Sequence, residues 1–150
     1  MAGKLANTKK PKWFVKYVIR RWTKHYKIDF SEYVVPEKGF KNFNAFFTRH
    51  LKEGVRKISD GVVSPVDGVI FDFGKITGDH KIYVKFKHYY IDDLICDTYE
   101  EMNSYTVLYL SPSNYHRVHA CFDMEITDIS YLPGTLHSVK PKVVFKKDSV

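Results

Sequence analysis

Two histidines and one carboxylate are the residues of this chain best suited by type and position to proton-transfer chemistry. His116 and His119 lie three residues apart in the segment Ser111–His119, directly after a run of residues typical of a strand. Asp67 lies in a turn, Ser64–Gly68, between two apolar runs. A carboxylate can fix the tautomer of an imidazole and stabilise its protonated form, so that the imidazole removes a proton from a hydroxyl. These residue types therefore predict a general-base site.

The same residues also have simpler explanations. Asp67 can satisfy the backbone groups of its own turn, as Asp commonly does. His116 and His119 can be structural groups, hydrogen-bonded at the end of a strand. Together the three residues would also make a ligand set for a metal-dependent hydrolase. Position in the sequence leaves these alternatives open.

The positive charge of the chain is concentrated at its N-terminal end. The formal net charge is +7 over 150 residues, and residues 1–28 carry seven Lys, two Arg and no acid. These nine charges leave the rest of the chain with a net charge of −2. We therefore expect an anionic partner to bind within residues 1–28.

The composition is that of a globular domain rather than of a membrane-spanning or disulfide-rich protein. Apolar residues make up 44% and charged residues 27% of the chain. No stretch approaches the roughly 20 apolar residues that a membrane-spanning helix needs, and the N-terminus lacks the apolar core of a secretory signal. Cys96 and Cys121 have neither a disulfide-framework pattern nor metal-ligand spacing. We expect free thiols in a reducing cytoplasm.

Residues 13–26 predict an amphipathic helix with a basic face. Its apolar stripe consists of Phe14, Val15, Val18, Ile19, Trp22 and Tyr26. Such a stripe beside cations is typical of a helix lying on an anionic membrane surface. The residues expected to face the membrane are Arg20, Arg21, Trp22 and Lys24. A surface helix that packs its stripe on the domain is the alternative, whereas nucleic-acid binding is not favoured because no nucleic-acid motif accompanies the charge.

The remaining patterns predict an α+β fold. A second helix is expected over Asn42–Leu51, with Asn42 as its N-cap. After Lys57 the apolar period changes from that of helices to that of strands. The expected strands are Val62–Val63, Val69–Phe73, Ile82–Phe86, Thr106–Leu110 and Asp123–Leu132, with a helical turn at Tyr90–Cys96 and a turn at Pro133–Gly134. We expect a helical, membrane-associating region at 1–57, followed by a mostly antiparallel and incomplete β domain at 58–150.

Four motifs, in the same order along the chain, resemble those of the phosphatidylserine decarboxylase family. The first, Phe40–Arg49, follows the pattern F-x-x-F-N-x-F-F-x-R that is typical of an N-terminal helix in that family. The others are Val63–Gly68, Leu110–His119 and Leu132–Val139. The resemblance covers about a hundred residues, so the chain is identified as similar to most of the family's β chain.

The resemblance implies a pyruvoyl-dependent enzyme that converts phosphatidylserine to phosphatidylethanolamine and CO2. In the family, a proenzyme cleaves itself at a Gly-Ser bond, and the serine becomes a pyruvoyl group on the new α chain. His119 then matches the base of the self-cleavage triad and Asp67 the residue that orients it. His116 matches the histidine that assists decarboxylation. The implied location is peripheral, on the cytoplasmic face of a membrane, with a homodimer as a possible assembly.

The chain departs from the family pattern after its fourth motif. It contains no Gly-Ser dipeptide, and neither Ser138 nor Ser149 follows a glycine. No residue of the chain therefore matches the pyruvoyl-forming serine. We expect a β-chain-like fragment that works with a pyruvoyl-bearing α chain supplied separately. The alternative is an inactive relative that binds anionic lipid surfaces, and a metal-dependent hydrolase is a third, remote possibility.

Overall fold

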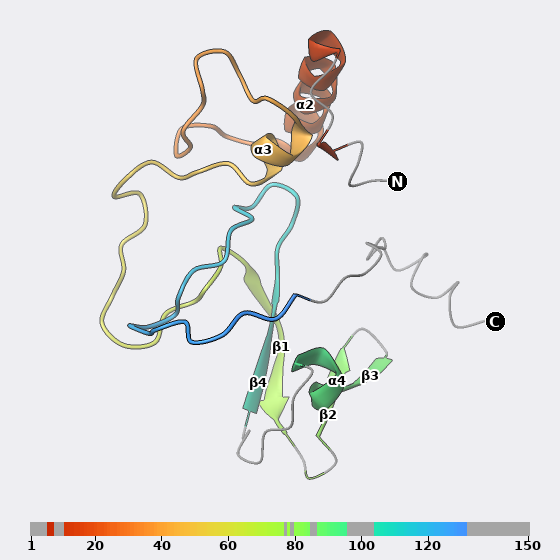
Figure 1. The fold of residues 1–150 in the computed structure, drawn as a ribbon, viewed down its shortest axis with the longest axis vertical. Helices are drawn as coiled ribbons and strands as arrows, with labels where there is room; N and C mark the ends of the chain where they lie inside the picture. The colour runs from red at the N-terminus through yellow and green to blue at the C-terminus, as the bar shows by residue number, and fades with distance from the viewer. Residues whose placement is uncertain are drawn as a thin grey trace, which may run out of the picture.

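The computed structural model describes residues 6–7, 11–76, 78, 80–84, 87–95 and 104–131. Helices α2 and α3 lie at one end of the molecule and the strands at the other (Figure 1). The segment that follows the last strand returns to the helical end, where it meets α3 (Figure 1). This return brings the segment Ser111–His119, called the histidine segment below, to the helices. The α+β class with antiparallel sheets is confirmed.

Helix α2 spans Lys12–Tyr26, so the predicted helix is confirmed to within one residue. Pro11 precedes it, and the fixed φ of proline, −69° here, suits that position. The helix ends where Lys27 takes a left-handed conformation and donates its backbone N–H to Thr23. Val15 is buried, and the ring of Trp22 lies 5.0 Å from that of Phe43. The apolar stripe thus packs on the domain.

Helix α3 spans only Phe43–Phe47, although the predicted helix extended to Leu51. Its predicted N-cap is confirmed, because the Asn42 side chain accepts a hydrogen bond of 2.8 Å from the backbone N–H of Ala45. The predicted C-terminal end is wrong because the next residues pair with a distant segment. Leu51 forms an antiparallel bridge with Tyr33, and the backbone N–H of Val34 donates to the carbonyl of His50.

An aromatic cluster around α3 forms the core of the helical end. Phe46 has no exposed surface. Its ring lies 5.5 to 6.2 Å from the rings of Phe30, Phe40 and Phe43. This packing holds α3 in place although it has barely more than one turn, a length that is unstable in isolation.

Two antiparallel strand pairs make up the β part. β1 (Val69–Lys75) pairs with β4 (Ser104–Tyr109), and β2 (Lys81–Val84) pairs with β3 (Lys87–Tyr90). α4 (Ile91–Ile95) follows β3 directly and confirms the predicted helical turn. Gly68, at the entry to β1, is required there because a Cβ would lie 2.9 Å from the backbone oxygen of Tyr109. The sheet therefore starts at the turn that carries Asp67.

Two predicted strands are wrong. Residues 62–63 and 123–131 form neither helix nor strand, because in the described part of the chain no neighbouring segment pairs with them along a ladder. Lys85, Phe86, Leu132 and the predicted turn at Pro133–Gly134 lie outside the described residues.

Many apolar side chains of the β part are exposed. They include Val69, Ile70, Phe71, Phe73, Phe122, Ile126, Ile129 and Tyr131. Phe73 is 73% exposed although it belongs to a paired strand. An exposed apolar surface of this kind is unusual for a monomeric domain, and the predicted incompleteness of the β domain stays a prediction. The predicted domain boundary at residue 58 stays a prediction.

Candidate active site

Two arginines dock the histidine segment onto the end of α3. The Arg49 side chain is 1% exposed, and its Nη2 donates to the carbonyls of Ser113 and Asn114 at 2.7 and 3.0 Å. In the opposite direction, Arg117 Nε donates 2.8 Å to the carbonyl of Thr48. Segments more than sixty residues apart are therefore held together by charge-assisted bonds. These bonds fix the chain on both sides of His116.

His116 is held as a neutral imidazole against α3. Its ring stacks on Phe47 with centroids 4.0 Å apart and an interplanar angle of 18°. Burial lowers the pKa of His116, a hydrogen bond with the backbone of Ser111 raises it, and the nearby charge of Arg49 lowers it. Burial is the largest of these effects. Its Nε2 is buried and has no hydrogen-bond partner among the described residues. A buried polar atom without a partner is costly, so this nitrogen is suited to a group that the described residues do not supply.

The segment that carries Asp67 lies beside the segment that carries His119. The backbone N–H of His119 donates 2.9 Å to the carbonyl of Pro65, and that of Val63 donates 2.8 Å to the carbonyl of Cys121. These two bonds join the motif Val63–Gly68 to His119, the last residue of the motif Leu110–His119, and to Cys121 two residues further on. Asp67 and the two histidines, predicted to form one site, are thus carried by adjoining segments.

Asp67 is bound by an arginine that sequence reasoning missed. Arg56 donates to the Asp67 carboxylate through Nη2 at 2.6 Å and through Nε at 2.9 Å. Its Nη2 also donates 2.9 Å to Glu32. The bonds to Asp67, and then those to Glu32, raise the pKa of Arg56. No pattern in the sequence singles out Arg56, which precedes the Asp67 turn by eleven residues and belongs to no regular element.

The expected bond between Asp67 and His119 does not form within the described part of the chain. His119 Nε2 instead lies 2.9 Å from the hydroxyl of Tyr115, and the two rings stack with centroids 5.5 Å apart. Tyr115 is 4% exposed, and this burial raises the pKa of its hydroxyl. The charge of Arg117 lowers that pKa and the charge of Asp67 raises it, both by less than the burial does. The hydroxyl therefore keeps its proton, which it can donate to Nε2 of His119. The spacing of four residues between Tyr115 and His119 was the one available signal for this pair.

The described residues contain no group of three or more His, Cys, Asp or Glu side chains that could share a metal ion. Asp67 is occupied by Arg56, and His119 Nε2 by Tyr115. The three predicted site residues are therefore not arranged as a metal-ligand set. Their placement on adjoining segments suits proton transfer instead.

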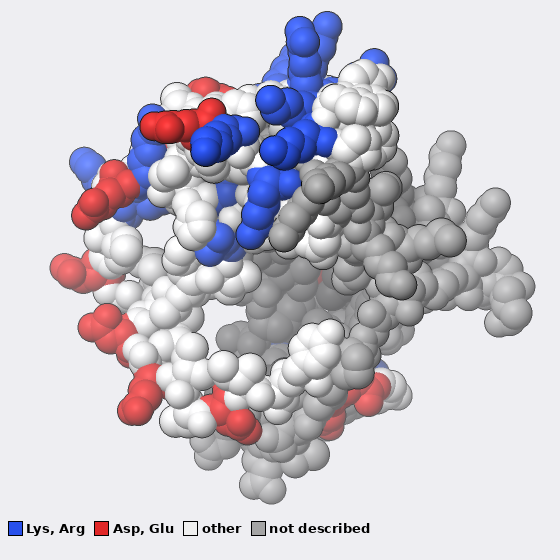
Figure 2. Space-filling view, turned by 45° about the horizontal axis from the view of Figure 1, so that its top comes forward, with Lys and Arg blue, Asp and Glu red and all other residues white. Residues whose placement is uncertain are grey.

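The basic residues of α2 form a surface of their own. Figure 2 shows Lys and Arg side chains gathered over the helical end of the molecule. Arg20, Arg21 and Lys24 are exposed on α2, as are the aromatic rings of Trp13 and Tyr17. Trp22 differs from the prediction for a membrane-facing residue, because it is half-buried against Phe43. Within the described part of the chain, no helix has the length and apolar character that a membrane crossing requires.

Comparison with known proteins agrees with the motifs. The family model described as phosphatidylserine decarboxylase matches residues 43–149. The chain is 38% identical over 148 residues to a phosphatidylserine decarboxylase proenzyme of Methylobacillus flagellatus, with 94% of this chain and 52% of that protein covered. The proenzyme of Psychrobacter cryohalolentis is 40% identical over 148 residues, covering 93% and 53%. That of Coxiella burnetii is 36% identical over 137 residues, covering 85% and 49%.

The chain spans about half the length of the curated relatives that it matches. Within that span, the matched region includes α3, the Asp67 turn and the histidine segment. The chain belongs to the phosphatidylserine decarboxylase family.

Proposed function

We propose that this chain supplies the histidine and aspartate machinery of a pyruvoyl-dependent phosphatidylserine decarboxylase. The observation that carries the proposal is the placement of Asp67, His116 and His119 on adjoining segments within a family-matched region. The relatives are named proenzymes, which supports maturation into a processed chain pair. The pyruvoyl-bearing α chain is then the partner that completes the site.

His119 is proposed as the base of self-cleavage. A neutral imidazole whose Nε2 accepts a hydrogen bond has its proton on Nδ1, and Nε2 can take a proton from a serine hydroxyl. The Asp67 carboxylate has acceptor positions beyond those that Arg56 occupies, so it can also accept the Nδ1 proton of His119. The bonds from Arg56 hold that carboxylate in one orientation. For the serine to bind Nε2, the Tyr115 hydroxyl must first give up its own bond to that nitrogen.

His116 is proposed to act in the decarboxylation itself. The pyruvoyl group, when present on the α chain, would supply the electron sink for the electron pair that is left on the substrate carbon when CO2 leaves. The buried and unpartnered Nε2 of His116 is the atom of this chain suited to face that group. Because burial keeps His116 neutral, it adds no charge that would hold the substrate carboxylate in place. Once its Nε2 has taken up a proton, the lowered pKa makes His116 a ready donor of that proton to the reacting carbon after CO2 leaves.

Helix α2 is proposed to bring the enzyme to its lipid substrate. Its exposed cations and interfacial aromatic rings suit an anionic membrane surface. The substrate is itself an anionic lipid, so the same surface attracts the enzyme and concentrates the substrate. We propose a peripheral location on the cytoplasmic face of the membrane.

The experiment joins this chain to the missing half of a relative. Residues 1–131 are fused to the C-terminal half of the Methylobacillus flagellatus proenzyme, so that both are made as one polypeptide. Cleavage of the fusion and formation of phosphatidylethanolamine are then measured. We expect cleavage and product in the wild type, neither in His119→Ala, and cleavage without product in His116→Ala. A folded hybrid in which His119→Ala is still fully cleaved would refute the assignment of His119.

A further inference from the structure

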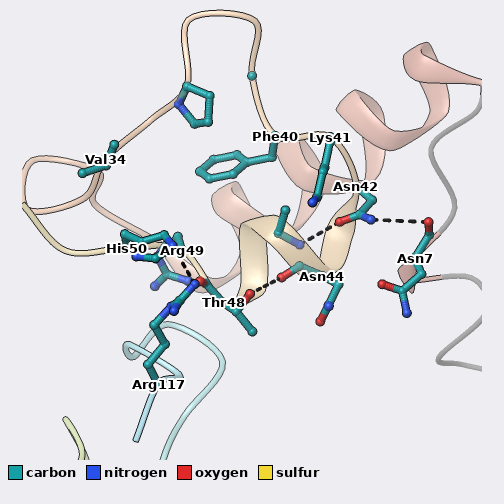
Figure 3. Close-up of a pocket in the computed structure, with 13 residues that line it drawn as sticks. Asn7, Val34, Phe40, Lys41, Asn42, Asn44, Thr48, Arg49, His50 and Arg117 are labelled. Atoms are coloured by element: carbon teal, nitrogen blue, oxygen red, sulfur yellow. Dashed lines mark hydrogen bonds between the residues drawn. The ribbon is translucent and has the colours of Figure 1, made fainter. Parts of the chain in front are cut away.

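A cleft of about 690 Å³ lies beside α3, on a face of that helix other than the one that holds His116. It is lined by three cationic side chains, those of Lys41, Arg49 and Arg117, and by no carboxylate. Figure 3 shows Arg49 and Arg117 together with His50 at one end of the cleft and Lys41 toward the other. The amide side chains of Asn42 and Asn44 line the wall between them. A concave surface with this charge balance attracts anions.

The two arginines of the cleft have no carboxylate partner among the described residues. Arg49 is 1% exposed, yet its charge meets only two carbonyls and the faces of Tyr33 and Phe46, whose ring centroids lie 4.1 and 5.6 Å from Cζ. Its Nε and Nη1 are buried without a hydrogen-bond partner in the described part of the chain. A buried guanidinium without a counter-ion is costly, so Arg49 points to an anion that the described residues do not supply.

Arg117 is arranged to present its charge toward the cleft. Its Nε is used on Thr48, and its Nη2 lies 2.7 Å from Nε2 of His50. A guanidinium can only donate, so Nε2 of His50 is the acceptor of this bond, and a histidine has no negative charge that would compensate Arg117. Lys41 is exposed at the other side of the cleft and adds a mobile ammonium. The accessible donors are thus Lys41 and Arg117, while Arg49 adds positive potential from beneath them.

We infer that this cleft binds a phosphate group, held by Lys41 and Arg117. Arginine and lysine together are the usual partners of phosphate oxygens, and the lining amide side chains of Asn42 and Asn44 add neutral donors. Two sources share this chemistry: the phosphodiester of a lipid headgroup and free phosphate. The inference does not depend on the decarboxylase proposal, since the cleft shares no residue with Asp67, His116 and His119.

The test is a titration of the chain with inorganic phosphate, in which the backbone amide NMR signals are recorded at each phosphate concentration. Chloride is added to keep the ionic strength constant. We expect saturable shifts at Asn44, Thr48 and Arg49, and about fivefold weaker binding in Lys41→Ala, which removes one charge-assisted contact. Lys38→Ala is the matched control, because Lys38 is exposed on the same loop but does not line the cleft. Chloride alone producing the same shifts, or Lys41→Ala binding as tightly as Lys38→Ala, would overturn the inference.

A second titration with monomeric dihexanoyl phosphatidylglycerol separates the two sources. Binding at lower concentration than phosphate, with shifts that extend to Val34 and Phe40, assigns the cleft to a lipid headgroup. Binding of inorganic phosphate alone assigns it to free phosphate. Binding of neither probe contradicts the inference. Since Lys41 is exposed and outside α3, its replacement leaves the fold intact, and spectra of the unliganded variants verify this.

Discussion

The Tyr115 hydroxyl lies 2.9 Å from Nε2 of His119, the nitrogen that a general base at this position would use. Tyr115 is buried, with its ring centroid 6.5 Å from that of Tyr33, and Arg49 fixes the two carbonyls that precede it. The hydroxyl is therefore held rigidly where it meets His119. A hydrogen bond donated by this hydroxyl favours the tautomer of His119 that carries its proton on Nδ1.

Replacing Tyr115 by Phe should release that selection. The ring and its stacking are kept, but the hydrogen bond to Nε2 is lost. We expect His119 to move from the Nδ1–H toward the Nε2–H tautomer, as seen in the ¹⁵N shifts of its ring. Tyr26→Phe serves as the control, because the Tyr26 ring packs on His25 and Trp22 rather than on His119. Unchanged His119 nitrogen shifts in Tyr115→Phe would show that the hydroxyl does not set the tautomer.

His116 should make the stability of the fold depend on pH. Its pKa is lowered from 6.5 in the folded chain, so the unfolded chain binds more protons at mildly acidic pH. The contribution is therefore present above about pH 6.5 and is lost as pH falls through the folded pKa. His116→Phe keeps the stack on Phe47 and should flatten this dependence between about pH 5 and pH 7.

The measurement is the urea midpoint at a series of pH values. His25→Gln is the control, because His25 is exposed on α2. Equal slopes of stability against pH in the wild type and in His116→Phe would contradict burial of a neutral His116.

Arg49 should contribute to stability more than any exposed cation. Arg49→Met keeps much of the side-chain volume but leaves the carbonyls of Ser113 and Asn114 without their donor. We expect the free energy of unfolding to fall by about 2 kcal/mol, because two charge-assisted bonds outweigh the relief of burying an uncompensated charge. Lys38→Met should change it by less than about 0.5 kcal/mol. Denaturant unfolding measures both, and an Arg49→Met protein as stable as the wild type would show that this docking is dispensable.

Charge reversal on α2 should abolish binding to anionic vesicles. Replacing Arg20, Arg21 and Lys24 by Glu removes about 1 kcal/mol of attraction per cation, which weakens binding by more than about a hundredfold. Sedimentation with phosphatidylserine-containing vesicles at low salt measures this.

The matched control reverses three exposed lysines away from α2: Lys52, Lys57 and Lys75. It has the same net charge as the first variant, so equal loss of binding in both would mean that total charge rather than the α2 surface governs attachment.

The elements that the sequence predicted well are those whose signals are local. Pro11 and the 3.6-residue period mark α2, and Asn42 caps α3. The alternating run after Gly68 marks β1. Each of these signals depends on neighbours within a few residues, so a single sequence shows them. The four motifs are also local patterns, and they indicated the family from the sequence alone.

The elements predicted wrongly depend on distant partners. The C-terminal end of α3 was misplaced because Leu51 pairs with Tyr33, and the strand at 123–131 was misplaced because no described segment pairs with it. Strand formation needs a second strand, and a periodic pattern does not reveal whether one is there.

By itself, the sequence determined the family, the basic helix and the three residues able to move protons. Only the tertiary structure decided which groups these residues meet. Asp67 is held by Arg56, His119 by Tyr115, and His116 by the face of Phe47. The physical reason is that hydrogen bonds and ring stacking act over a few ångströms in space. Residues up to sixty-nine positions apart reach that range only when the chain folds back on α3.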